Sequence, residues 1–222
     1  PDLVTPWPTT SEPFVGSFSG VPNNGDYTVS IVKSASGDFN LIGNPYPSAI
    51  DADAFITGNA ATFTNGTLGT TLYFWTHNTP ITANSYFFND YALYNFTGAT
   101  GVGTVAPNSG NNNNPAPRYI AAGQAFMIKG VNVGSFPATF RNTMRVAGSN
   151  TFFFRQSGGA ANTLVSVVEN LERNRIWLDL KNSDGAYKQI LVGYIQNATN
   201  AFENGYDGEV VEAENPVGLY SL

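Results

Sequence analysis

Apolar and polar residues alternate in short runs along this chain. Between Tyr27 and Lys33, the residues Tyr27, Val29 and Ile31 are separated by single residues of a second face, which is the period of a half-buried β-strand. Similar runs, separated by clusters of Gly, Asn, Pro and Ser, predict further strands at residues 14–18, 39–42, 71–76, 91–96, 120, 125–129 and 138–140. The pattern therefore predicts an all-β protein.

The later part of the chain carries a clear hairpin signal. Residues 175–180 and 187–195 read as paired strands, and the polar run at 182–185 reads as their turn. Aromatic residues at 152–154 and the glycine pair at 158–159 mark a crossing between two parts. We predict a jelly-roll-like β-sandwich over residues 1–147 and a smaller β-sandwich-like portion over residues 148–222. That portion is small, so we expect the first domain, or chain beyond Leu222, to complete its core.

Composition supports strands joined by turns. Apolar residues make up 42% of the 222 residues and aromatic residues 14%, whereas charged residues make up only 12%, against about 25% in an average domain. The surface must be polar without being charged, and Asn, Thr, Ser and Gly supply that polarity. Thr and aromatic residues fit a pleated surface while Asn and Gly fit turns, so a helical bundle is disfavoured.

Several classes of protein are disfavoured by charge and residue usage. The net charge is −6, and the first 140 residues hold only three basic side chains, so nucleic acid is not an expected partner. No apolar run is long enough to span a membrane, and no signal peptide is present. There is no Cys and only one His, His77, without a nucleophile motif beside it. Because the chain starts at Pro1, we expect a mature fragment of a longer protein.

Two aspartates follow a proline-rich turn. We predict a short helix over residues 49–56 that is capped by Ser48, with Asp51 in its first turn, where the helix dipole favours a carboxylate. Its apolar side would hold Ala52 and the residues at 55 and 56. The alternative is that Asp51 and Asp53 supply oxygen ligands to Ca²⁺, although no EF-hand-like ligand series surrounds them. We therefore expect no cofactor and keep Ca²⁺ as the alternative.

Aromatic residues gather in two segments, 72–78 and 86–96. In a strand, Tyr73 and Trp75 face one way while the residues at 72 and 74 face the core. Exposed flat rings beside Asn and Asp are surfaces on which sugar rings stack. The candidate ligand-binding residues are Tyr73, Trp75, Tyr86, Asp90, Tyr91 and Tyr94. The alternative is that both faces of the sheet are covered and that all of these rings are core packing.

Catalytic residues are not evident. Hydrolysis of a glycoside needs a pair of carboxyl groups across an open cleft, and Asp51, Asp53 and Asp90 are the plausible members near the aromatic segments. No paired acid and base stands out, so we expect a protein that is not an enzyme, with a glycoside-active enzyme as the alternative. The acidic run at residues 203–214 is expected to form a solvated loop.

The order of several motifs resembles a known module. The motifs are NLIGNPYPSAID (40–51), LYFW (72–75), YIAAGQAFMIK (119–129), FRNTMRV (140–146), RNRIWLDL (173–180), QILVGY (189–194) and ATNAFENGYDG (198–208). From about residue 14 onward the chain resembles the β-rich module that precedes the C-terminal sorting domain in cargo proteins of the type IX secretion system. The sorting signal itself is absent or only begun at residues 217–222.

The resemblance implies a place and a kind of function. It implies a secreted or cell-surface bacterial protein, because such modules occur in adhesins and beside polysaccharide-degrading enzymes, and it brings no catalytic residues with it. The expected function is a non-catalytic extracellular module that is adhesive or carbohydrate-binding. The expected partners are a polysaccharide or cell-surface glycan and the neighbouring domains of a larger chain. The alternative is a structural spacer that presents or supports those domains.

Overall fold

The fold is built from short strands with two short helices among them. The computed structural model describes residues 19–35, 38–64, 68–75, 91–101, 115–150, 154, 174–181, 187–209 and 218–220. The strands are β1 (Tyr27–Lys33), β2 (Phe39–Gly43), β3 (Ala49–Asp51), β4 (Leu68–Trp75), β5 (Tyr91–Asn95), β6 (Gly98–Thr100), β7 (Tyr119–Ile120), β8 (Ala125–Gly130), β9 (Gly134–Phe140), β10 (Arg145–Val146), β11 (Asn174–Lys181) and β12 (Tyr187–Tyr194). The helices are α1 (Ala52–Gly58), α2 (Ala60–Thr64) and the 3₁₀ turn η2 (Asn142–Met144). The all-β prediction is confirmed.

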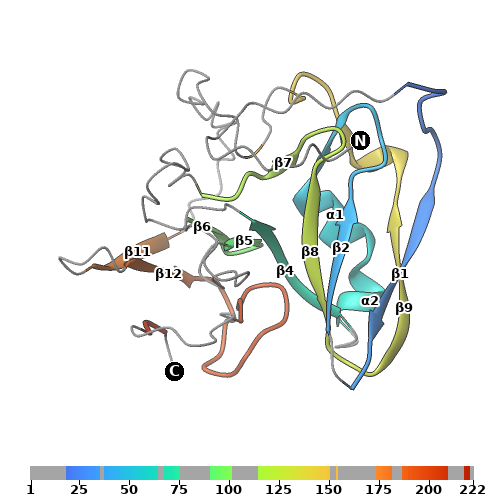
Figure 1. Ribbon diagram of the computed structural model, residues 1–222. Coiled ribbons are helices and arrows are strands. Elements are labelled where there is room, and N and C mark those ends of the chain that lie inside the picture. The colour runs from blue at the N-terminus through green and yellow to red at the C-terminus, as the bar shows by residue number, and fades with distance from the viewer. Residues whose placement is uncertain are drawn as a thin grey trace, which may run out of the picture.

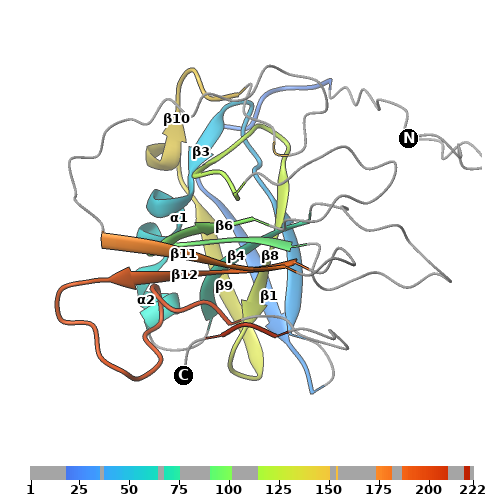
Figure 2. The same ribbon diagram turned by 90° about the vertical axis from the view of Figure 1, so that its left-hand side faces the viewer.

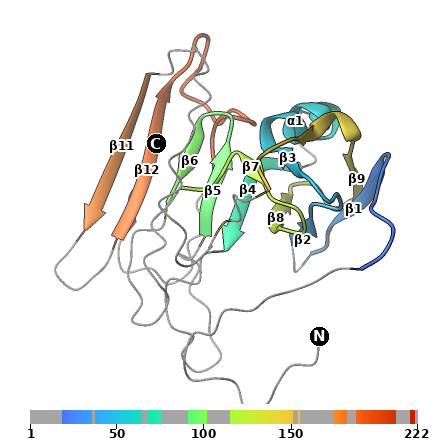
Figure 3. The ribbon, with the colours of Figure 1, turned by 90° about the horizontal axis from the view of Figure 1, so that it is seen from above.

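The main sheet has five strands in the order β2-β8-β4-β5-β6. Strands β1 and β9 form a separate pair beside it, β10, β3 and β7 form a small third sheet, and β11 and β12 form a hairpin. All pairs of named strands are antiparallel. Seen from above, the hairpin, the main sheet and the β1–β9 pair follow one another across the molecule (Figure 3). The arrangement is sandwich-like, and the finer jelly-roll assignment stays a prediction.

The core lies between the main sheet, the β1–β9 pair and the two helices (Figure 1). Phe55 of α1 is fully buried, and its ring contacts Phe63 of α2, Phe126 of β8 and Phe140 of β9. Helix α1 therefore joins the two sheets through one aromatic cluster. The predicted apolar side of the helix is confirmed, because Ala52, Phe55 and Ile56 are all buried.

The predicted start of this helix is wrong. Residues 49–51 form β3, which pairs with β10 and β7, so the helix begins only at Ala52. Asp51 is the N-cap, and its carboxylate accepts a hydrogen bond from the backbone N–H of Asp53. The hydroxyl of Ser48 instead accepts a hydrogen bond from the side chain of Arg145, 2.8 Å away. Residues 49–51, which the sequence assigns to the first turn of the helix, therefore form a β-strand that pairs with its neighbours.

The predicted pairing of the two hairpin strands is confirmed, while the predicted turn at 182–185 lies outside the described residues. The hairpin packs against the edge of the main sheet. Strands β11 and β12 pair over their whole length, and β12 contacts β6. The indole N–H of Trp177 donates to the carbonyl oxygen of Ala99, and the backbone N–H of Gly101 donates to the side chain of Gln189. The main sheet twists strongly, so that β6 and the hairpin lie across the direction of β2 and β8 (Figure 2). The division into two domains at residue 147 stays a prediction.

Candidate functional site

The register of the main sheet sorts its side chains onto two faces. Leu72 and Phe74 of β4 point into the core, together with Phe126 of β8. Tyr73 and Trp75 therefore lie on the opposite face, which we call the outer face. Trp75 is paired with Tyr91 of β5 in the register, while the row of Tyr73 continues through Met127 of β8 to Leu41 of β2. The predicted division of β4 into a core face and an aromatic face is confirmed.

Tyr94 does not belong to the outer face. It lies in the core cluster with 6% of its surface exposed, and its hydroxyl donates to a carboxylate oxygen of Asp53, 2.9 Å away. The physical reason is the two-residue period of a strand, which places Tyr91 and Tyr94 on opposite sides. The expectation that Tyr94 forms part of an exposed aromatic platform is therefore wrong.

One half of the outer face is covered by residues 203–209, which we call the covering segment. The carbonyl oxygen of Gly205 accepts from the backbone N–H of Phe96, and that of Tyr206 accepts from the side chains of Asn95 and Thr97. Gly205 has φ of +106°, and a Cβ there would meet the Phe96 ring at 3.2 Å, so this position requires glycine. Over residues 203–209 the expected solvated loop is confirmed only for its side chains, because Asp207 and Glu209 are exposed while the backbone docks on the sheet. Residues 210–214 of the acidic run lie outside the described residues.

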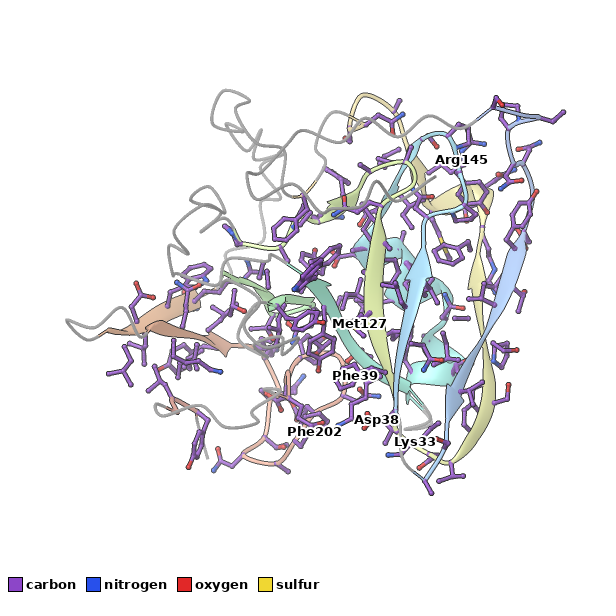
Figure 4. All side chains as sticks on the ribbon, viewed as in Figure 1. Lys33, Asp38, Phe39, Met127, Arg145 and Phe202 are labelled. Carbon is purple, nitrogen blue, oxygen red and sulfur yellow. The ribbon has the colours of Figure 1, made fainter. Side chains whose placement is uncertain are left out.

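The covering segment also explains why Tyr73 is only 3% exposed. Its hydroxyl donates to the carbonyl oxygen of Glu209 at 3.1 Å, and its ring meets the edge of Phe39. The carboxylate of Glu209 forms an ion pair with Lys129, which lies over the Phe39 ring. Figure 4 shows where Phe39 and Met127 lie along the main sheet. Tyr73 is therefore a covered residue of the outer face and not a free ring.

A cavity of about 550 Å³ opens where β4 ends and β5 and β8 begin, and it is lined by outer-face residues together with Phe74, Phe126 and Phe154 of the core. Trp75, 39% exposed, and the half-buried Tyr91 stand at one side of it, and Leu41, 69% exposed, stands at the other. The lining comes from Leu41, Tyr73, Phe74, Trp75, Tyr91, Gln124, Ala125, Phe126, Met127 and Phe154. Nine of these ten residues are apolar or aromatic, and none carries a charge. Its volume lies within the range of small-ligand sites, about 300–1,000 Å³.

Gln124 is the one amide in the lining, and it is 4% exposed. Its side-chain oxygen accepts hydrogen bonds from the backbone N–H groups of Ala121 and Phe154. Backbone N–H groups can only donate, so this oxygen is fixed by chemistry, and the amide nitrogen must occupy the other position. The backbone N–H of Gln124 donates to Ala121, and its carbonyl oxygen accepts from Asn44. No pattern along the chain distinguishes this Gln from any other polar residue.

The aspartates form an ion-pair cluster away from the cavity lining. Arg118 donates to both oxygens of Asp51, at 2.8 and 3.1 Å, and its Nε lies 3.5 Å from a carboxylate oxygen of Asp53. Asp53 also accepts a hydrogen bond from the hydroxyl of Tyr94. Among the described residues, no group of three or more acidic or histidine side chains is placed to hold a metal ion. Both carboxylates thus have protein partners that explain their presence.

Two buried tyrosines of the sheet are held in the neutral form. Burial raises the pKa of the Tyr73 hydroxyl well above its usual value, and the charges of Glu209 and Asp38 raise it further. Burial likewise raises the pKa of Tyr94, and the charge of Asp53 and the hydrogen bond to it act in the same direction. Both residues lie on the sheet, one on each face, so both report on its integrity at high pH.

Three candidate site residues of the sequence analysis lie outside the described residues, as do the predicted strand at 14–18 and the glycine pair at 158–159. The three residues are Tyr86 and Asp90 of the aromatic platform, and His77. Of the remaining platform candidates, Trp75 and Tyr91 both line the cavity. Tyr73 also lines it, although the covering segment buries most of its ring, and Tyr94 lies in the core. The candidate site is therefore the cavity beside Trp75 and Tyr91.

Comparison with known proteins places the chain in one family. A family model described as a domain of unknown function (DUF8693) matches residues 4–222. The chain belongs to this family. The DUF8693 match includes the main sheet, the covering segment and the β11–β12 hairpin, so the cavity and the segment beside it fall within one family unit. No curated protein and no solved structure matches the chain.

Asn44 is a structural residue that sequence reasoning missed. It is 4% exposed, its side-chain nitrogen lies within 3.0 Å of the carbonyl oxygens of Ser48, Ile120 and Ala121, and its side-chain oxygen accepts from the backbone of Tyr46. This network holds the proline-rich turn against the strand that leads to Gln124. The signal was the asparagine before Pro45, a residue type that hydrogen-bonds to its own turn.

Proposed function

We propose that this chain is a non-catalytic extracellular binding module whose ligand is an uncharged carbohydrate. The observation that carries the proposal is the open cavity in which Trp75 and Tyr91 lie side by side on paired strands. Aromatic rings present flat apolar faces on which the C–H face of a sugar ring packs. The cavity lining has no charged side chain, which favours a neutral glycan over an acidic one.

The proposal includes a place for the protein on the bacterial surface. Its support is the resemblance to modules of type IX secretion cargo, together with a surface that is polar and poor in charge. The described residues contain no helix with the length and apolar character needed to cross a membrane. In the bacterium that makes the protein, an antibody to this chain should label intact cells or the culture medium. Labelling confined to lysed cells would contradict this part of the proposal.

The ligand proposal is tested by Trp75→Ala. Loss of a central ring in a binding site commonly costs 2 kcal/mol or more, which is about 30-fold in affinity. We expect a glycan array to identify a ligand for the wild-type chain, and isothermal titration to show at least about a tenfold loss for Trp75→Ala. The melting temperature should change little, because Trp75 is partly exposed at the end of β4.

A matched control is available on the hairpin. Trp177 is 46% exposed, but it lies on β11 and is not part of the cavity lining. Trp177→Ala should leave glycan affinity unchanged. Absence of binding to any glycan by the wild-type chain, or equal losses in both tryptophan variants, would overturn the proposal.

A structural spacer is the second candidate function. It is favoured by the covering segment, which ties residues 203–209 to β4, β5 and β8 through Tyr73, Asn95 and Lys129. A spacer requires a rigid connection between its ends and no ligand. The titration that supports or rejects glycan binding therefore separates the two candidates.

A further inference from the structure

Gln124 is the one amide in the cavity lining, and its orientation is fixed. Gln124 is only 4% exposed, and its side-chain oxygen accepts hydrogen bonds from the backbone N–H groups of Ala121 and Phe154 at 3.3 and 3.4 Å. Its backbone groups are also paired. Gln124 lines the cavity. Among the described residues, no protein group accepts a hydrogen bond from its side-chain nitrogen.

This nitrogen is not one of the fully buried side-chain atoms without a partner, so water reaches it in the free protein. A ligand that displaces this water without accepting from the nitrogen would leave the donor without a partner, which weakens binding. The Oε1 contacts prevent the amide from turning over, so this side chain can offer a ligand two N–H donors and no free acceptor of its own. The ligand must therefore carry a hydrogen-bond acceptor at the position that reaches Gln124.

The rest of the lining limits what can surround that acceptor. Much of the lining cannot replace the hydrogen bonds that a ligand makes with water, because it consists of the side chains of Phe74, Phe126, Met127 and Phe154. A sugar hydroxyl pressed against them would lose its own donor partner, which is costly. An acetamido group has a strong carbonyl acceptor beside a methyl group, so it satisfies the amide nitrogen and places apolar surface on the rings.

We propose that Gln124 is the specificity-determining donor of the cavity, and that the ligand is a neutral glycan carrying N-acetylated sugars. This inference rests on the proposed carbohydrate-binding function and adds the class of sugar. Trp75 and Tyr91 pack against the sugar ring, while the side-chain nitrogen of Gln124 donates to the acetamido oxygen.

The test compares two tetrasaccharides that differ at one substituent. A tetramer of N-acetylglucosamine and a tetramer of glucose, both β-1,4-linked, carry an acetamido group and a hydroxyl group, respectively, at carbon 2. Isothermal titration of the wild-type chain should show at least about tenfold tighter binding of the N-acetylated tetramer, the worth of one hydrogen bond of about 1.4 kcal/mol. The comparison needs no variant, so it decides the ligand class whatever happens to mutants.

Gln124→Glu assigns the preference to this residue. Glutamate keeps an oxygen for the N–H groups of Ala121 and Phe154 but replaces the donating nitrogen with an oxygen. The variant should lose the tenfold preference while retaining the weaker affinity for the glucose tetramer, and thermal unfolding verifies that it is folded. Trp75→Ala should weaken both tetramers together.

Each remaining outcome contradicts a defined part of the inference. Equal wild-type affinity for the two tetramers, or a preference that survives in folded Gln124→Glu, overturns the role of Gln124 and leaves glycan binding standing. Binding of other glycans on the array, but of neither tetramer, overturns the N-acetyl assignment alone. Binding of an N-acetylated dipeptide amide in place of sugars assigns the cavity to peptides, and binding of no glycan at all overturns the proposed function with the inference.

Discussion

Replacing Phe55 with alanine is expected to lower the free energy of unfolding by about 3–5 kcal/mol, the usual range for a phenylalanine removed from a core. Phe55 is fully buried, and its ring centroid lies 4.9 Å from that of Phe140 and 5.6 Å from that of Phe126. These two rings belong to β9 and β8, which lie in different sheets. The alanine variant would therefore leave a cavity at the point where α1 joins the two sheets.

Urea unfolding followed by tryptophan fluorescence measures this loss. Phe202→Ala is the matched control, because Phe202 is 69% exposed and an exposed substitution should change stability by no more than about 0.5 kcal/mol. If Phe55→Ala cost as little as the control, the described core would not be the one that holds the protein together.

Removing the hydroxyl of Tyr73 or Tyr94 is expected to change how stability depends on alkaline pH. Below the usual tyrosine pKa of about 10, each hydroxyl is protonated in both the folded and the unfolded chain. Above it, the unfolded chain loses the proton, while the folded chain keeps it because the pKa is raised. Unfolding then releases a proton, so each tyrosine lowers the free energy of unfolding by about 1.4 kcal/mol per pH unit between about pH 10 and its raised pKa.

The variants Tyr73→Phe and Tyr94→Phe should therefore cross the wild type. At pH 7 each should be about 1 kcal/mol less stable, because a hydrogen bond to Glu209 or Asp53 is lost. Near pH 11 the difference should vanish, and above that pH the variants should be the more stable proteins. Urea unfolding at half-unit steps from pH 7 to pH 11.5 measures the crossing. A constant difference at every pH would show that neither hydroxyl keeps its proton in the folded state.

Much of the fold could be predicted because strands announce themselves locally. The alternation of Tyr27, Val29 and Ile31 placed β1 within the bounds that the structure gives, and the hairpin of β11 and β12 followed from two apolar runs around a polar turn. The same two-residue period places Tyr91 and Tyr94 on opposite faces of the sheet, so the sequence could have excluded Tyr94 from the aromatic platform. The helix start was less accessible, since it depends on pairing of β3 with strands about 70 and 95 residues away.

The site could be predicted only in part, for a related reason. The aromatic segments identified Trp75 and Tyr91, but no local pattern shows that residues 203–209 return to cover Tyr73. The orientation of the Gln124 amide is fixed by the backbone N–H of Phe154, 30 residues further along the chain, so no local pattern reveals it. The sequence places Asp51 in the first turn of a helix or, with Asp53, at a Ca²⁺ site, because Arg118, which binds both carboxylates, is 67 residues from Asp51.

The covering segment also has a consequence for how this protein reaches its folded state. Its contacts join residues separated by 134 positions for Thr70 and Asn204 and by 136 for Tyr73 and Glu209. Contacts of such long range form slowly, because a large loop must close before they stabilise anything. All strands of the main sheet lie before residue 131, but its outer face is covered only when residues 203–209 dock. A nascent chain that ends before residue 203 therefore leaves the Tyr73 ring without this cover. Covering of the sheet is thus a late event in folding, and chains cut short at that point would expose an apolar surface prone to aggregation.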